Sequence, residues 1–341
     1  YEYDNYRHIV NYAYYDIHDR PCFIKEGYHI MQVRYDERGN ICHQSFYNNN
    51  NVPCVNKDGA GIIMMSYDTK NNITQIDHMN TIGENINLDI LDYSTEKRIY
   101  DEKNRLIYIS FLNKDGYLCW KHTQTFEYCI IKQTYDDNNN IIKYEYLDPD
   151  EKPTNRSGRA ITEMIYDNYN RPIERKYYDK DLQLMPGQSF GKAIELFNYD
   201  DNNRLKVLTL LNTDSTFYVS RHYSYDIYGN VLSVEHRDIN GKLKIAEDRY
   251  NSFVPYAKLI VERDNKGNML SRCYCDVNDK LANNDDGFAI EKYTYNEYGQ
   301  LISDELFDYK GKPVNSIIQK WHKATSCYDD KGLIKEVSYF S

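Results

Sequence analysis

Short segments that mix apolar and polar residues recur along the whole chain, separated by groups of turn-forming residues. Leu301 to Asp308 is one such eight-residue segment, and it follows the turn-like run Tyr295 to Gln300. In such runs an Asp side chain can accept hydrogen bonds from backbone N–H groups ahead of it, and Gly or Asn can adopt a positive φ. The pattern therefore predicts a turn followed by a strand, repeated many times.

An aromatic residue followed by Asp or Asn marks the start of each repeat, and we call this aromatic position the anchor. The anchors recur about every 32 residues, and the two irregular spacings, 26 and 38, together equal two periods, so the array keeps its phase. The anchors are Tyr3, Tyr35, Tyr67, Tyr100, Tyr135, Tyr166, Tyr199, Tyr225, the degenerate Arg263, Tyr295 and Tyr328.

A second position, the landmark, holds Asp or Asn thirteen residues after each of the first ten anchors. The constant spacing indicates a turn plus a strand whose register a single insertion would invert. Turn-forming residues follow the landmark as well, as in Asp238 to Leu243, so a second turn closes each hairpin. The landmarks are Asp16, Asn48, Asn80, Asn113, Asp148, Asp179, Asn212, Asp238, Asp276 and Asp308.

The return path from landmark to next anchor varies in length, and most repeats carry an insert of about six residues there, such as Pro21–Gly27 and Pro53–Gly59. Because the inserts leave from the same place in the repeat, they should line one edge or face of the array. Tyrosines at equivalent positions should stack into cross-strand ladders. Examples are Tyr14, Tyr146, Tyr177 and Tyr274.

These features predict an all-β fold of about ten tandem β-hairpins with a period of about 32 residues, forming one long, curled antiparallel meander or β-solenoid. No linker interrupts the repeats, so we expect residues 1–341 to form a single continuous array. The array starts two residues before an anchor and stops at the landmark position Ser341, which suggests a fragment of a longer array.

Composition supports strands and excludes some partners. Tyrosine contributes 36 residues, whereas Gly and Pro contribute 16 and 8. The net charge is −10 with interspersed signs, which gives no basic footprint for nucleic acid. No apolar run is long enough to cross a bilayer as a helix. The eight cysteines are too sparse for a disulfide framework, so we favour free thiols used as small apolar residues.

Sequence signatures of catalysis or metal binding are missing. The nine histidines show no zinc spacing, and His78 and His236 stand where other repeats hold an aromatic, so packing explains them better. Asp-rich turns suit calcium, but one carboxylate per turn rarely supplies six to eight ligands. No nucleophile motif or phosphate-binding loop occurs. We expect no enzyme activity, no metal and no cofactor.

The long insert between Asp238 and Arg263 supplies the candidate binding residues. Aromatics and Arg are enriched where partners bind, so Arg249, Tyr250, Phe253 and Tyr256 are candidate ligand contacts. The alternative is that they pin the insert to its own sheet. The same two interpretations apply to Trp120 and Trp321, which follow the second turn in their repeats.

The anchor segments Tyr35–Asn40 (YDERGN) and Tyr225–Asn230 (YDIYGN) resemble the tyrosine-aspartate (YD) repeats of bacterial cell-surface and RHS-type proteins. The hairpins also resemble repeats of the MORN and WG type. The resemblance implies a non-enzymatic scaffold with an extended Tyr-rich surface for protein or glycan binding, at the cell surface or outside the cell. The alternative that it implies is a structural wall segment of an RHS-like shell, which encloses or spaces another domain.

Overall fold

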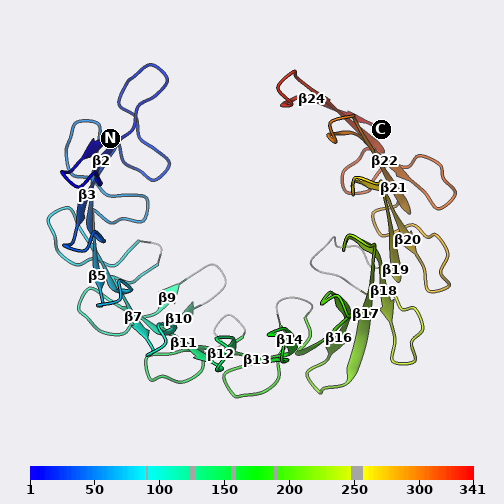
Figure 1. Cartoon of the computed structure of the whole chain (residues 1–341), viewed down its shortest axis with the longest axis horizontal. Coiled ribbons are helices and arrows are strands. Elements are labelled where there is room, and N and C mark those ends of the chain that lie inside the picture. The colour runs from blue at the N-terminus through cyan, green and yellow to red at the C-terminus, as the bar shows by residue number, and fades with distance from the viewer. Residues whose placement is uncertain (90, 123–126, 155–158, 188–190, 247–255) are drawn as a thin grey trace. The chain divides into compact units, whose positions relative to one another are not determined.

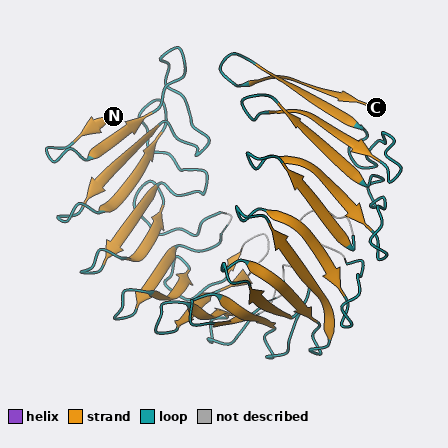
Figure 2. Cartoon of the chain, turned by 45° about the vertical axis from the view of Figure 1, so that its right-hand side comes forward, coloured by secondary structure: helices purple, strands orange, loops and turns teal. Residues whose placement is uncertain are grey.

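A computed structural model describes residues 1–341 except 90, 123–126, 155–158, 188–190 and 247–255. The described residues form 24 strands and no helix (Figures 1 and 2). Contacts between residues divide the chain into two units: unit 1 contains residues 1–166 and 177–183, and unit 2 contains residues 167–176 and 184–341. The single continuous array expected from the sequence stays a prediction.

The strands are short and follow the repeat. In unit 1 they are β1 (Glu2–Tyr3), β2 (Ile9–Ala13), β3 (Ile30–Tyr35), β4 (Ile41–Tyr47), β5 (Ile62–Tyr67), β6 (Ile73–Met79), β7 (Thr95–Tyr100), β8 (Leu106–Leu112), β9 (Lys121–His122), β10 (Glu127–Tyr128), β11 (Ile130–Tyr135), β12 (Ile141–Leu147) and β13 (Ile161–Tyr166). The remaining strands, of which β14 is divided between the units, are β14 (Pro172–Tyr178), β15 (Ile194–Tyr199), β16 (Leu205–Leu211), β17 (Phe217–Tyr225), β18 (Val231–Arg237), β19 (Lys258–Arg263), β20 (Met269–Cys275), β21 (Ile290–Tyr295), β22 (Leu301–Phe307), β23 (Lys323–Tyr328) and β24 (Ile334–Phe340).

Neighbouring strands pair antiparallel in chain order. In unit 1 the hairpin β3–β4 pairs with β5 of the next repeat, and in unit 2 the hairpin β21–β22 pairs with β23. The small strands β9 and β10 pair with each other. The described residues contain no helix that is long and apolar enough to span a membrane. The predicted all-β class, tandem hairpins in an antiparallel meander, is confirmed.

The first turn of each repeat is built around the Asp that follows the anchor. Asp36 Oδ1 accepts hydrogen bonds from the backbone N–H groups of Arg38 (2.9 Å) and Asn40 (2.8 Å). Gly39 takes a φ of 83°, and the register shifts by a bulge between Arg34 and the anchor Tyr35. This is the turn chemistry that the sequence predicts, because a residue of positive φ closes the turn and the carboxylate satisfies its N–H groups.

The second turn repeats the same geometry at the landmark. Asp238 Oδ1 accepts from the backbone N–H groups of Asn240 and Lys242, both at 2.9 Å, and Gly241 has a φ of 79°. The two turns of a hairpin are therefore made in the same way. This explains why the outward strand tolerates no change of length: a fixed local turn sets the register at each of its ends.

The anchor tyrosine joins one repeat to the one before it. Tyr199 donates its hydroxyl hydrogen to the carbonyl of Pro172 at 2.8 Å, and Pro172 begins the preceding outward strand. Tyr328 does the same to Leu301 at 2.8 Å. The same bond is formed by Tyr35, Tyr67, Tyr100, Tyr135, Tyr166 and Tyr225. The recurrent Tyr thus has a structural role that its hydroxyl, and not only its ring, fulfils.

Replacing Tyr199 by phenylalanine should lower the free energy of unfolding by about 1 kcal/mol, because one partly buried hydrogen bond is lost while the ring remains. Urea denaturation of the whole chain measures this change. Tyr169→Phe is the matched control, since Tyr169 is 73% exposed at a turn tip. Equal midpoints for the two variants would contradict the role assigned to the hydroxyl.

Arginine at the sixth turn position reinforces the contact between repeats. Arg204 donates from Nε to Asp200 Oδ2 (2.7 Å) and from a terminal nitrogen to the carbonyl of Asp226 (3.0 Å) in the next first turn. Its guanidinium carbon also lies 4.8 Å from the ring centroid of the next anchor, Tyr225. Such stacking attracts a cation to the ring face. Arg204 therefore secures its own turn and the following one.

The inserts lie side by side, as their common position in the repeat predicts. The Lys57 N–H donates to the carbonyl of Glu26 in the preceding insert at 2.7 Å. Further along, Ser316 Oγ donates to the buried carboxylate of Asp286 at 2.7 Å. Successive inserts are thus bonded to one another at the opposite end of the strands from the first turns.

Aromatic ladders form the core of each unit. In unit 1, Tyr93, Phe111 and Tyr128 are buried, and the Phe111 ring lies edge-on at 4.9 Å from Tyr93 and 5.7 Å from Tyr128. In unit 2 the ladder runs through His236, Tyr256, Tyr274 and Phe288.

Tyr14, Tyr146 and Tyr274 do take part in cross-strand ladders, but their direct ring partners are Tyr28, Tyr128 and Tyr256 respectively and not tyrosines at equivalent positions. Tyr177 is buried as well, with the Arg159 guanidinium 5.3 Å above its ring. The residues that complete each ladder come from the return path rather than from equivalent positions of the next outward strand.

The two histidines at aromatic positions pack into these ladders. His78 is 9% exposed, its Nδ1 lies 2.9 Å from the carbonyl of Ser94, and burial lowers its pKa. His236 is fully buried against Tyr256. All eight cysteines are free thiols. Burial raises the pKa of Cys129 to about 12, which makes it a poor nucleophile at neutral pH.

Candidate functional site

Two equivalent grooves open between successive first turns of unit 2, and we call them the first-turn grooves. The first has a volume of about 550 Å³ and the second about 640 Å³. The first is lined by Asn202, Arg204, Tyr225, Asp226, Ile227, Tyr228 and Gly229. The second is lined by Asn296, Tyr298, Gln300, Tyr328, Asp329, Asp330, Lys331 and Gly332. In both grooves one wall comes from the third and fifth residues after an anchor and the other from the next Tyr-Asp turn.

Bonds between repeats fix the walls of these grooves. In the first groove Arg204 spans from Asp200 to the carbonyl of Asp226. In the second groove Gln300 occupies the equivalent position and donates from Nε2 to the carbonyl of Gly332 at 3.0 Å. The anchors Tyr225 and Tyr328 are held by their own hydroxyl bonds. The grooves are therefore formed by the repeat itself and need no rearrangement to exist.

Exposed aromatic side chains lie along the grooves. Tyr228 is 76% exposed and Tyr298 is 81% exposed. Each is the third residue after its anchor, the position that Tyr169 holds earlier in unit 2. A tyrosine ring offers a flat apolar face together with a hydroxyl that donates and accepts hydrogen bonds. This combination suits contact with a peptide or a sugar ring.

The carboxylates beside these rings are already engaged. Asp226 accepts from the backbone N–H groups of Tyr228 and Asn230, both at 2.9 Å. The hydrogen bond from the Asn230 side chain, together with those backbone bonds, holds the pKa of Asp226 below its usual value, so it is ionised at neutral pH. Desolvation partly opposes this effect. Asp226 thus orders the turn instead of acting as a free base.

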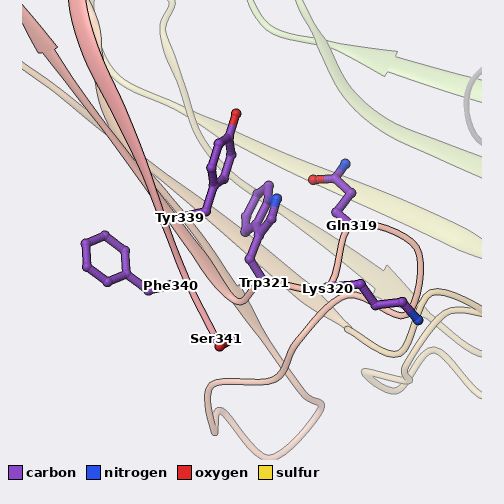
Figure 3. Close-up of a pocket in the computed structure, with 6 residues that line it drawn as sticks. All are labelled: Gln319, Lys320, Trp321, Tyr339, Phe340 and Ser341. Atoms are coloured by element: carbon purple, nitrogen blue, oxygen red, sulfur yellow. The ribbon is translucent and has the colours of Figure 1, made fainter.

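A third opening in unit 2 contains Trp321 (Figure 3). Its volume is about 580 Å³, and Gln319, Lys320, Tyr339, Phe340 and Ser341 also line it. The Trp321 and Tyr339 ring centroids are 5.9 Å apart at an interplanar angle of 38°. Tyr339 is 64% exposed, and Figure 3 shows its ring beside the indole while Phe340 points the other way.

The candidate contact residues predicted from the sequence lie in different parts of the structure. Tyr256 is 7% exposed and belongs to the core of unit 2, where Trp321 packs against the same cluster. Trp120 lies in unit 1 and packs against Cys129, Ile130 and Leu147. These positions fit the interpretation that the aromatics pin the chain to its own sheet. Arg249, Tyr250 and Phe253 lie outside the described residues.

The groove residues Tyr228 and Tyr298 were missed by the sequence analysis. The available signal was a second tyrosine three residues after the anchor, which occurs at Tyr6, Tyr169, Tyr228 and Tyr298. This signal is weak, because that position is otherwise a generic turn position. Only the structure shows that a neighbouring turn shares the groove, the preceding turn for Tyr228 and the next turn for Tyr298.

Comparisons with known proteins give distant likenesses only. No family model matches the sequence, and no curated protein matches it. A crystal structure of TcdB2-TccC3-TEV is 12% identical with a TM-score of 0.32, over 92% of this chain and 18% of that one. The Tc holotoxin pore of Photorhabdus luminescens is 12% identical with a TM-score of 0.29, over 92% of this chain and 20% of that one.

A porin-like protein from Bacteroides uniformis is 9% identical with a TM-score of 0.24, and the match covers 72% of this chain and 87% of that one. The chain thus spans about a fifth of the length of the two toxin structures. All three TM-scores are below 0.5, so we draw nothing on function or assembly from these likenesses.

Proposed function

We propose that this chain is a non-enzymatic repeat scaffold that binds a protein or glycan partner through the Tyr-rich first-turn edge of unit 2. The observation that supports the proposal is the recurrence of one groove in two equivalent places, each lined by one exposed tyrosine: Tyr228 on the next-turn wall of the first groove and Tyr298 on the opposite wall of the second. Two similar sites on one edge of unit 2 can engage a partner that itself repeats, and such paired binding raises affinity without any new kind of contact.

The chemistry of the grooves supports binding rather than catalysis. In the first groove the Asp226 carboxylate accepts hydrogen bonds from backbone N–H groups of its own turn. Arg204 donates hydrogen bonds to Asp200 and to the carbonyl of Asp226 in the next turn. A general base or nucleophile needs a side chain that is free to meet the substrate. A location at the cell surface or outside the cell is part of the same proposal and rests on the YD resemblance.

A glycan array and a peptide array, each probed with the whole chain, test the proposal. The double variant Tyr228→Ala/Tyr298→Ala should lose about tenfold in affinity for each ring removed, because an aromatic contact at a binding surface contributes more than about 1 kcal/mol. Tyr6→Ala is the matched control, since Tyr6 holds the same turn position in unit 1 and is 83% exposed. Unchanged binding by the double variant would remove both grooves from consideration.

The contacts inferred from the sequence can be tested in the same assay. A variant with residues 245–257 replaced removes Arg249, Tyr250, Phe253 and Tyr256 together. Trp321→Ala opens the third pocket without touching the first-turn grooves. Because Tyr256 and Trp321 belong to the core of unit 2, loss of binding moves the site away from the grooves only in a variant whose circular dichroism matches that of the wild type.

A second candidate function is a structural wall segment that encloses or spaces another domain. The bonds that join successive repeats at both ends of the strands favour it, as between Arg204 and Asp226 and between Ser316 and Asp286. Small-angle X-ray scattering of the whole chain separates the two functions. A closed hollow particle without affinity for any array supports the wall, and an open body with array binding supports the scaffold.

A further inference from the structure

Acidic side chains paired with arginine lie buried on the sheet of unit 2. Glu195 is 2% exposed and contacts Arg175 on the neighbouring strand β14 at 3.0 Å. Glu291 is 6% exposed and contacts Arg272 on the neighbouring strand β20. In both places one guanidinium lies opposite one carboxylate in the strand register. Buried charges persist when they are paired in this way.

The second pair differs from the first because a third ionisable group, Asp304, joins it. Arg272 is registered opposite Glu291, and Tyr293 is registered opposite Asp304. Residues opposite each other, or two apart on a strand, share a face of the sheet. Arg272, Glu291 and Asp304 therefore lie on one face across the three strands β20, β21 and β22.

Asp304 has no cation of its own. Its Oδ1 is buried and has no hydrogen-bond partner among the described residues. On the far side β22 pairs with β23, where Ala324 faces Asp304 and brings no charge. Glu305, on the same strand, is engaged by Lys323 at 2.9 Å. Arg272 is thus engaged by Glu291, and Asp304 lies on the same face of the sheet without an ion pair among the described residues.

Electrostatics agrees with this geometry. Burial, and then the negative charge of Glu291, raise the pKa of Asp304 to about 7, although Arg272 opposes the shift. Glu305 adds a smaller repulsion. The phenol of Tyr293 also faces the group, and burial raises its pKa far above neutrality, so it stays uncharged.

We infer that Asp304, which lies beside the Arg272–Glu291 pair, keeps its proton up to about neutral pH, and that release of this proton loosens the hairpins β21–β22 and β23–β24. The inference does not rest on the proposed binding function, although the turns of these two hairpins form the walls of the second first-turn groove. Proton release makes the order of this part of unit 2 sensitive to pH between about 5 and 8.

The direction follows from linkage. Asp304 binds its proton more tightly in the folded chain than in the unfolded chain, so its contribution to stability is complete at acid pH and is lost as the pH rises through about 7. The local opening constant should rise about a hundredfold from pH 5 to pH 8. His222 in unit 2 acts in the opposite sense, because burial lowers its pKa and its protonation disfavours the folded state.

Hydrogen exchange of the whole chain, corrected for the intrinsic effect of pH, tests the inference on peptides covering residues 290–307 and 323–340. The wild type should open more readily at pH 8 than at pH 5.5. Asp304→Asn should abolish this rise, although His222 and its opposite contribution are still present in that variant. Asp329→Asn is the control. The Asp329 carboxylate lies in a nearby first turn, where its Oδ1 accepts hydrogen bonds from the backbone N–H groups of Lys331 and Leu333. This control variant should retain the wild-type rise.

A direct titration on the unmodified chain keeps the inference testable if Asp304→Asn perturbs the fold. With ¹³C-labelled aspartate, the Asp304 carboxyl resonance should move with an apparent midpoint near 7. A midpoint near 4, or an Asp304→Asn variant that keeps the full pH dependence of exchange, would overturn the inference.

Discussion

Replacing Phe111 by alanine is expected to destabilise unit 1 by about 3–5 kcal/mol, the range for deleting a fully buried phenylalanine side chain. Phe111 is 1% exposed and stands between Tyr93 and Tyr128 in the aromatic ladder. The Lys121 ammonium also lies 4.3 Å from its ring centroid. Alanine would leave a cavity and remove both edge-on ring contacts, and the fixed strand register prevents the neighbours from closing the gap.

Urea denaturation followed by fluorescence in a Trp321→Phe background measures this effect, because Trp120 is then the only tryptophan and belongs to unit 1. Tyr117→Ala is the control: Tyr117 is in the same repeat and is 73% exposed at a turn. It should change stability by less than about 0.5 kcal/mol. A loss below about 1 kcal/mol for Phe111→Ala would show that the ladder is not the core of unit 1.

Replacing Gly61 by alanine should cost about 1–3 kcal/mol, the usual penalty for overpacking. A Cβ at Gly61 would lie 2.6 Å from the backbone nitrogen of Thr81 and 2.8 Å from its Cα. These are backbone atoms, so they cannot move aside as a flexible side chain would. Thr81 also follows the landmark Asn80, whose second turn fixes its position.

The matched control for this substitution is Ser94→Ala. Ser94 holds the position directly before the return strand β7, as Gly61 does before β5, and both positions lie in unit 1. Alanine occupies this position in other repeats, at Ala193, Ala257 and Ala289. Ser94→Ala should therefore fold with nearly normal stability. Equal stability of the Gly61 and Ser94 variants in urea would show that the approach to Thr81 is not tight.

The turns could be predicted from the sequence because their causes are local. The Asp at each turn bonds its own backbone within four residues, as Asp238 does, and this chemistry is visible in the order of the residues. Even here three positions depart from the expected residue types: Glu151, Leu182 and Ser215 adopt φ values of 59°, 60° and 63° where the other second turns carry Gly, Asn or Asp. The length of the outward strand could be predicted as well, because a local turn lies at each of its ends and the spacing from anchor to landmark is constant.

The ladder partners and the grooves could not be predicted, because they depend on which residues of different repeats meet. The return path varies in length, so the sequence alone does not show that Tyr128 meets Tyr146 or that Tyr256 meets Tyr274. In the sequence pattern Asp304 is an ordinary polar residue within a strand. Its burial beside Glu291 becomes visible only from the cross-strand register.

The pairing of each strand with its neighbours in the chain has a consequence for how the protein folds. Within unit 2, for example, β20 pairs with its chain neighbours β19 and β21, so each of these pairings closes a short stretch of chain. A fold made of such local contacts has a low contact order and needs no long loop to close first. We expect folding to start at any one hairpin and spread by addition of the next, at the speed of hairpin growth and without a single obligatory nucleus.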